Sequence, residues 1–210
     1  MTLALIWLWS IRLTHSYFRR ERWELGARED WRYADMRKRY GSAWPLASFF
    51  LVYLIQQGML VGLTLPLYAV FSSRRVWQPV LDSLATAGCL AGIGMAAVAD
   101  NQLFRFMEGN ERRLAAGKKP ELLLDTGLWR HSRHPNYFFE QLFWWSLALF
   151  GADVGAPGVA IGALFNTACM VQVTRLTEER MLRRPERVRL YREYVRRTSV
   201  WVPWPAAKQP

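Results

Sequence analysis

The residues best suited to chemistry lie in one stretch, residues 127–140, where cationic side chains stand directly before an apolar segment that opens with Pro135. Proline is favoured at the first position of a helix, because the helix has no use there for the N–H group that proline lacks. The unpaired backbone N–H groups of such a helix start, and its positive dipole end, would face the same place as Arg130, Arg133 and His134. This arrangement predicts a site for an anion such as a phosphate or carboxylate group.

Two further polar residues follow inside the same predicted helix. Asn136 and Glu140 are four positions apart, so they share one helix face. Glu140 lies about 7.5 Å along the axis from the start of the helix. An ionisable side chain at that depth in a membrane is costly unless it faces protein, water or a ligand, so we favour a functional role for it. The alternative is an interfacial ion pair with Arg130 or Arg133. A third polar residue, Tyr53, lies in the middle of another apolar segment, where it either lines a substrate pocket or bonds to neighbouring helices.

Other polar residues give weaker signals. Asp100 and Arg105 close an apolar segment, and two interpretations stay open for them: the exit of a helix into water, or a contribution to a site between the basic loops. Glu178 and Glu179 have arginines at helical spacing, which favours a solvated helix face. No group of histidines and cysteines has the spacing of a metal centre, so we expect no metal.

The elements that position these residues can be read from the distribution of charge. The chain has 210 residues, a net charge of +11 and 51% hydrophobic content, and long uncharged stretches alternate with arginine-rich ones. Binding of nucleic acid would explain the charge but not the uncharged runs, so we expect no nucleic-acid partner. The pattern predicts an all-α, polytopic membrane bundle forming a single domain over residues 1–210. Its five predicted spans are residues 2–18, 44–71, 76–99, 135–152 and 154–174.

The basic residues predict an orientation. They concentrate in the loops 19–43 and 100–134 and in the tail after residue 174. By the positive-inside rule these segments are cytoplasmic, which gives an outer N-terminus and a cytoplasmic C-terminus, and we expect the bacterial inner membrane. Residues 186–198 should form an amphipathic surface helix against anionic membrane lipids, with Val188, Tyr191 and Val195 on one face. The sequence does not indicate the oligomeric state.

Several motifs together resemble a known superfamily. Residues 125–140, with the core Arg-His-Pro-Asn-Tyr at 133–137, resemble the C-terminal signature of the steroid 5-alpha-reductase superfamily. Residues 29–33, 99–102 and 191–199 match it as well, so the resemblance covers nearly the whole chain. It is closest to the bacterial, largely uncharacterised steroid-reductase-like membrane proteins. The same superfamily includes the isoprenylcysteine carboxyl methyltransferases, which share an Arg-His-Pro-x-Tyr core.

The resemblance implies an all-helical membrane fold with a cytoplasm-facing cavity for NADPH, whose hydride reduces a carbon–carbon double bond. Glu140 matches the glutamate in the reductases' Asn-x-x-Gly-Glu pattern, whereas Phe139 stands where that pattern has glycine. From the residues and the resemblance together we expect a set of cofactor contacts. They are Asp100, Arg105, Arg130, Arg133, His134, Asn136, Tyr137, Tyr191, Tyr194 and Arg197.

Three functions are therefore weighed. The leading expectation is an NADPH-dependent reductase of a lipophilic, sterol-like or isoprenoid-like substrate, in which Glu140 or Tyr53 polarises the substrate carbonyl; for a carboxylic acid this needs a pKa raised by burial. The second is a methyltransferase that uses S-adenosylmethionine on a lipid or a lipidated cysteine. Guanidinium groups suit phosphates, which only NADPH carries, so the arginines favour the reductase. The third, a non-enzymatic scaffold binding anionic lipids, leaves Asn136 and Glu140 on one face unexplained.

Overall fold

The computed structural model of the protein describes residues 1–24, 26, 29–73 and 78–205. It is nearly all helical, which confirms the predicted fold class. The α-helices are α1 (Thr2–Arg20), α2 (Trp31–Tyr40), α3 (Trp44–Ser48), α4 (Ile55–Ser72), α5 (Pro79–Ala115), α6 (Pro135–Asp153), α7 (Ile161–Leu182) and α8 (Pro185–Arg197). Short 3₁₀ turns lie at η1 (Gly41–Ala43), η3 (Gly127–Arg130) and η4 (Pro157–Ala160), and a π-helical segment, η2 (Phe49–Leu54), joins α3 to α4.

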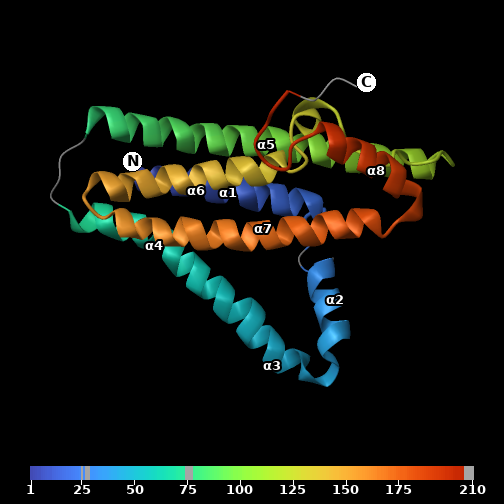
Figure 1. The fold of residues 1–210 in the computed structure, drawn as a ribbon, viewed down its shortest axis with the longest axis horizontal. Coiled ribbons are helices and arrows are strands. Elements are labelled where there is room, and N and C mark those ends of the chain that lie inside the picture. Colours follow the sequence, from blue (N-terminus) through green and yellow to red (C-terminus); the bar gives the residue numbers. More distant parts are fainter. Residues whose placement is uncertain (25, 27–28, 74–77, 206–210) are drawn as a thin grey trace.

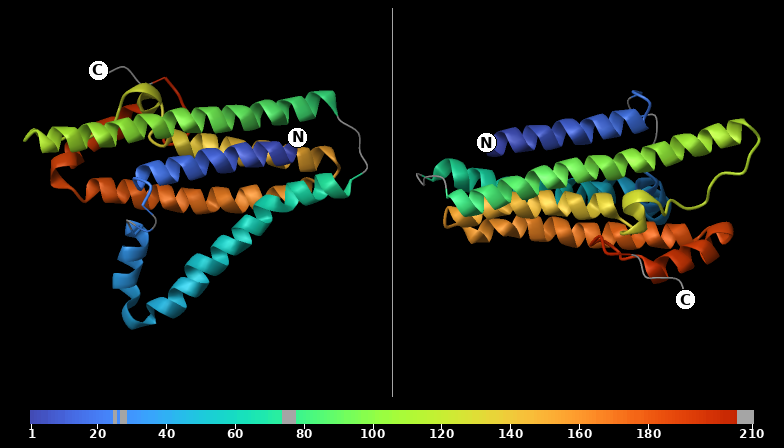
Figure 2. Two further views of the ribbon diagram at one scale, coloured as in Figure 1. Left: turned by 180° about the vertical axis from the view of Figure 1, so that it is seen from behind. Right: turned by 90° about the horizontal axis from the view of Figure 1, so that it is seen from above.

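Helices α1, α5, α6 and α7 run side by side and form the bundle (Figures 1 and 2). Its core is built around α6, whose Phe143 and Leu147 are completely buried. Trp9 of α1 stacks on Phe143 with ring centroids 5.8 Å apart. Burial of these large apolar groups therefore fixes α1 on the face of α6 that also carries the polar residues described below.

Glycines allow the closest helix contacts. A Cβ atom added at Gly92 of α5 would lie 2.8 Å from the carbonyl oxygen of Phe139 and 2.9 Å from the backbone nitrogen of Phe143, both on α6. Gly162 of α7 faces the backbone of Gly62 of α4 in the same way, with 2.0 Å from its added Cβ to the carbonyl oxygen. Small residues at such crossings let helix backbones approach in a membrane. The contact at Gly92 holds α5 against the first turns of α6.

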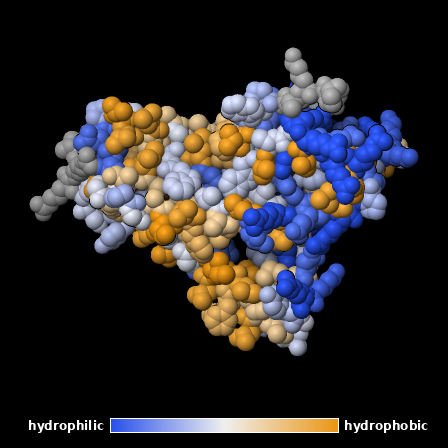
Figure 3. Space-filling model, in the orientation of Figure 1, coloured by the Kyte–Doolittle hydropathy of each residue, from blue (hydrophilic) through white to orange (hydrophobic). Residues whose placement is uncertain are grey.

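Residues 31–60 form an arm that leaves the bundle (Figure 1). It comprises α2, α3, η2 and the first turns of α4, and its apolar side chains are exposed, with Phe49 at 55%, Phe50 at 50% and Tyr53 at 61%. Figure 3 colours the α3, η2 and α4 side of this arm as hydrophobic, whereas the α2 side is more hydrophilic. An exposed apolar surface of this extent suits contact with lipid rather than with water.

Three of the described helical segments are long and apolar enough to cross a membrane: Trp31–Ser72, Pro79–Ala115 and Pro157–Leu182. They contain the predicted spans 44–71 and 76–99 and most of 154–174, apart from the start of the second span at residue 76, which lies outside the described residues. The other two predicted spans, 2–18 and 135–152, form α1 and α6 at the expected places. The protein is therefore a helical membrane protein, and the count of five spans stays a prediction.

The connections differ from the predicted loops in two places. Helix α5 continues to Ala115, so the first half of the predicted loop 100–134 is helical; the chain turns only at Gly117, which has a φ of +69°. The predicted loop 19–43 contains α2, whose first turn is capped by the Asp30 side chain accepting from the Arg32 backbone N–H. Helix α5 continues beyond its apolar residues because no proline stops it before Gly117, whereas α2 is a separate helix that begins at its own cap, Asp30.

The basic segments gather at one end of the bundle. The end of α1, the end of α5 and helix α8 lie at the end that Figure 3 colours as hydrophilic. The end of α4, the start of α5 and the α6–α7 connection lie at the other end (Figures 1 and 3). Helix α8 confirms the predicted helix 186–198 to within one residue. Its inner face is different from the prediction, however: Tyr191 and Tyr194 are buried, whereas Val195 is 39% exposed.

Candidate functional site

A polar cluster lies between α1, α5 and α6 near the basic end of the bundle. We call its members Trp9, Arg12, Asp100, Asn136 and Glu140 the arginine-bridged cluster. Arg12 donates from Nη1 to Asp100 Oδ2 at 3.1 Å and from Nη2 to Glu140 Oε2. Trp9 Nε1 donates to the other Glu140 oxygen at 2.5 Å. Asn136 Nδ2 donates to Asp100 Oδ1 at 3.2 Å, so one continuous network joins the three helices.

Burial makes this cluster energetically demanding. The side chain of Arg12 is 10% exposed, and those of Asp100 and Glu140 are each 19% exposed. Removing charges from water costs several kcal/mol per ion, and only close pairing with good hydrogen bonds offsets that cost. Arg12 Nε is also buried without a hydrogen-bond partner. The cluster therefore keeps donor capacity that no described residue uses.

The sequence predicted part of this cluster. Asn136 and Glu140 share one face of α6 as expected, and Asp100 at the predicted span end meets that face. The alternative prediction, that Glu140 pairs with Arg130 or Arg133, is wrong. Glu140 pairs with Arg12 of α1, which lies 128 residues earlier in the chain. Arg12 and Trp9 were missed as site residues. An arginine within an apolar stretch, with a tryptophan one turn before it, was the signal that could have found them.

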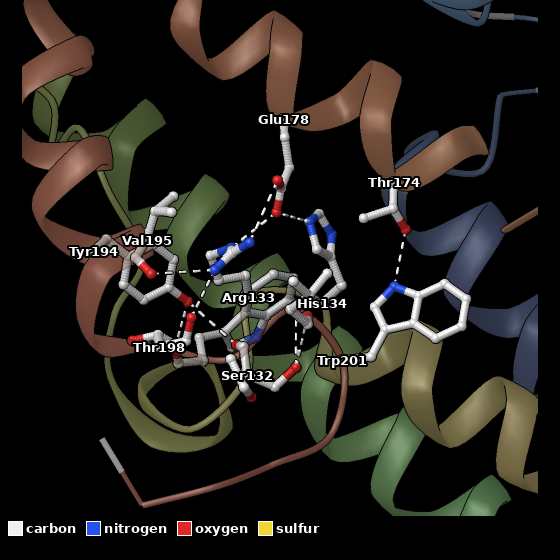
Figure 4. A network of polar contacts seen from close by, with 12 residues as sticks. Ser132, Arg133, His134, Thr174, Glu178, Tyr194, Val195, Thr198 and Trp201 are labelled. Carbon is white, nitrogen blue, oxygen red and sulfur yellow. Dashed lines mark hydrogen bonds and ion pairs between the residues drawn. The ribbon is translucent and has the colours of Figure 1, made fainter. Parts of the chain in front are cut away.

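A second polar network, which we call the clasp, lies where α6 begins (Figure 4). Arg133 Nε donates to Glu178 Oε1 of α7 at 2.8 Å, and His134 Nε2 lies 3.2 Å from the same oxygen. Arg133 Nη1 also donates to the carbonyl oxygen of Thr198 at 2.6 Å. The Arg133 and His134 side chains are each 7% exposed. The clasp thus ties the start of α6 to α7 and to the C-terminal tail.

The tail reinforces the clasp through its backbone. The N–H groups of Arg133 and His134 donate to the carbonyl oxygens of Ser199 and Val200 at 2.9 and 3.1 Å. Tyr194 donates its hydroxyl to the carbonyl oxygens of Trp129 and, at 3.2 Å, Ser132. Burial raises the pKa of the Tyr194 phenol, which keeps it a donor.

Two of the cationic residues of the predicted anion site, Arg133 and His134, therefore have partners within the protein. The Glu178 carboxylate takes the place of the expected anion, and carbonyl oxygens of the tail take the backbone N–H groups of Arg133 and His134. The interpretation of Glu178 as part of a solvated face is wrong, because its carboxylate turns inward to the clasp. A role for Arg133 and His134 as direct cofactor ligands stays a prediction.

The remaining predicted residues divide into two groups. Tyr137 joins the clasp by stacking on His134, with centroids 5.1 Å apart, and Tyr191 is buried on the inner face of α8. Arg105 and Arg130 are exposed, and Arg197 is half-exposed and pairs with Asp125. Tyr53 does not join the arginine-bridged cluster, since it is exposed on the arm. Among the described residues no group of histidine, cysteine and carboxylate side chains could hold a metal ion.

Comparison with known proteins places the chain in a family. The family model described as "Protein of unknown function (DUF1295)" matches residues 1–198. An uncharacterized protein of Schizosaccharomyces pombe is 30% identical over an alignment 207 residues long. The alignment covers 90% of this chain and 60% of the relative, so the chain spans about 60% of that protein's length. No solved structure matches the chain. Since the match begins at the first helix and extends through α8, with both polar networks inside it, this protein belongs to the DUF1295 family.

Proposed function

We propose that this protein is a membrane-embedded reductase that uses NADPH to reduce a carbon–carbon double bond in a lipophilic, sterol-like or isoprenoid-like substrate. The observation that carries the proposal is the arginine-bridged cluster. Ionised groups inside a membrane bundle are costly and mark functional sites by default. Membership of DUF1295, and the resemblance of residues 125–140 to the steroid 5-alpha-reductase signature, support this chemistry over other uses of such a cluster.

The residues present fit a nicotinamide nucleotide. Arg12 Nε is a buried donor without a partner, and the Asn136 amide, next to Asp100, can both donate and accept. A carboxamide group needs such a mixed set of partners. Exposed Arg105 and Arg130 near the same end offer guanidinium groups for phosphates. When bound, NADPH supplies the hydride for the reduction.

The geometry changes the role expected of Glu140. Both of its oxygens accept hydrogen bonds, from Trp9 and from Arg12, which suits an ionised carboxylate rather than a neutral acid that donates to a substrate. Glu140 would then orient Arg12, and Arg12 would be the cation that polarises a carbonyl oxygen conjugated to the double bond. Tyr53, the other residue expected to polarise the carbonyl, is exposed on the arm.

Cofactor binding to purified protein in detergent tests the proposal. The wild-type protein should bind NADPH in preference to S-adenosylmethionine, and Asn136→Ala should weaken NADPH binding about tenfold, as expected for loss of a buried hydrogen bond. Glu193→Gln, a substitution on the exposed side of α8, is the control and should leave binding unchanged. Binding of S-adenosylmethionine without NADPH would favour the methyltransferase, and a folded protein that binds neither nucleotide would support a scaffold.

We also propose that the basic end faces the cytoplasm, with an outer N-terminus, in a bacterial inner membrane. The alternation of connections between the two ends of the bundle supports this orientation (Figure 1). It would place both polar networks on the side where NADPH is available. A reporter that fluoresces only in the cytoplasm, fused after residue 205, should be bright; a dark reporter on an expressed, membrane-inserted chain would reverse the orientation.

A further inference from the structure

A groove lies between α7 and the tail, next to the clasp, with which it shares Glu178. It has a volume of about 540 Å³, and its walls come from one face of α7 and from the extended residues 199–202. The α7 side chains are Val171, Thr174, Arg175 and Glu178. A groove of this size is within the range of small-molecule sites.

The walls of the groove are held in place by packing and hydrogen bonds. Trp201 lies across from α7 and donates from Nε1 to Thr174 Oγ1 at 2.9 Å (Figure 4). The tail before it is anchored by the N–H groups of Arg133 and His134, which donate to the carbonyl oxygens of Ser199 and Val200. After it, the Trp204 N–H donates to the carbonyl oxygen of His131 at 3.0 Å. The groove is therefore a built feature of the fold.

The charge inside the groove is positive. Glu178 reaches it, but the Glu178 carboxylate is paired with Arg133 and His134 on the clasp side. Arg175, three residues before it on α7, lines the groove and is exposed. An anionic group entering the groove would find Arg175 as its partner.

The rest of the groove is apolar, and it continues into the membrane-facing side of α7. Ile161 is 58% exposed, Leu164 is 54% exposed and Val171 is 38% exposed. These positions lie at helical spacing along one side of the candidate span Pro157–Leu182, and the same side carries Arg175 one turn after Val171. An apolar chain lying along this stripe would place a polar end at Arg175.

We propose that this groove is a binding site for an anionic phospholipid. The lipid phosphate pairs with Arg175, and the start of one acyl chain lies between Val171 and the ring of Trp201. One cation at the end of a continuous apolar stripe matches a ligand that has an anionic head and an apolar chain. This match favours a lipid over a second protein chain. The site is independent of the proposed reductase activity, since it lies on α7 and the tail rather than on α1 and α5.

Native mass spectrometry of the intact chain in detergent tests the site. After incubation with equal amounts of phosphatidylglycerol and phosphatidylcholine, wild-type protein should retain one phosphatidylglycerol in preference. Arg175→Gln should lower the retained fraction about tenfold, the loss expected for one charge-assisted contact to phosphate. Arg192→Gln, on exposed α8, is the matched control and should retain lipid as the wild type does.

A second variant separates the apolar part of the site from its charge. Val171→Asp keeps Arg175 but puts a carboxylate into the groove, so it should abolish retention while circular dichroism shows the helix content of the wild type. Equal retention of both lipids, or an unchanged fraction in Arg175→Gln, would overturn the proposal. So would displacement of the lipid by millimolar inorganic phosphate, which would make the groove a site for small anions, or a dimer that forms in place of the lipid-bound monomer.

Discussion

Replacing Arg12 with methionine should destabilise the protein by about 3 kcal/mol. Removal of one partner from a buried ion pair costs about 3–5 kcal/mol, because the remaining charge is left without compensation. Two features place this case at the lower end: Asp100 and Glu140 are each 19% exposed, and each keeps one hydrogen-bond donor, Asn136 and Trp9 respectively. Methionine retains the apolar stem, so little packing is lost.

The double variant Arg12→Met/Glu140→Met, compared with the two single variants, measures the interaction free energy between Arg12 and Glu140. It removes one of the two carboxylates that the single variant leaves without their cation, and Asp100 keeps its hydrogen bond from Asn136, so the double variant should be more stable than the sum of the single variants predicts, by about 1–3 kcal/mol. The assay is reversible unfolding in mixed micelles with increasing dodecyl sulfate, followed by circular dichroism. Arg22→Met is the control, because the Arg22–Glu111 pair is exposed and should contribute about 0.5 kcal/mol or less.

The reasoning would be refuted by an Arg12→Met protein as stable as the Arg22→Met control. It would be refuted equally by a double variant whose loss is the plain sum of the two single losses. Either result would mean that the arginine-bridged cluster is solvated in the folded protein, and the energetic argument for a functional site would then have no basis.

Two further predictions concern packing and pH. Gly92→Ala should lower stability by about 1–2 kcal/mol, because its methyl group meets rigid backbone of α6, whereas Gly94→Ala, with open space around it, should raise stability by up to about 1 kcal/mol; the same unfolding assay measures both. Burial raises the pKa of the Tyr191 and Tyr194 phenols, so above pH about 10 the unfolded chain loses protons that the folded chain keeps. Stability should therefore fall as the pH rises from about 9 to 11, and replacement of both tyrosines with phenylalanine should make that fall shallower; an equally steep fall in the double variant would contradict this account.

The positions of the helices could be predicted because they depend on local signals. Pro135 and Pro79 stand at helix starts, and the apolar runs between arginine-rich segments give most of the helix lengths. The end of α5 could not be found in this way. Helix formation does not stop where the hydrophobic stretch stops, and residues 100–115 contain good helix formers, so the helix continues until the turn at Gly117.

The partners of the charged residues could not be predicted, because they depend on contacts between distant segments. Arg12 interrupts an apolar run, which marks it as a residue that needs a polar partner, but the sequence does not say which residue that partner is. Only the packing of α1 on α6 brings Arg12 to Glu140, with which it forms an ion pair. Glu178 has arginines at helical spacing on its own helix, yet its carboxylate pairs with Arg133 from another segment. Local charge spacing therefore did not decide which pair forms.

Phe139 differs from the reductase pattern that residues 125–140 resemble, and the neighbouring helix α5 accommodates the difference. The reductase pattern has glycine at this position of α6, and here Phe139 is 8% exposed, with its backbone against Gly92 of α5. Helices α5 and α6 can approach closely only if one residue at the contact has no side chain, and Gly92 of α5 is that residue. Because α6 is helical, the Phe139 ring points away from its neighbour Glu140, which keeps its contacts with Trp9 and Arg12. The substitution therefore fills a different side of α6 and leaves the arginine-bridged cluster intact.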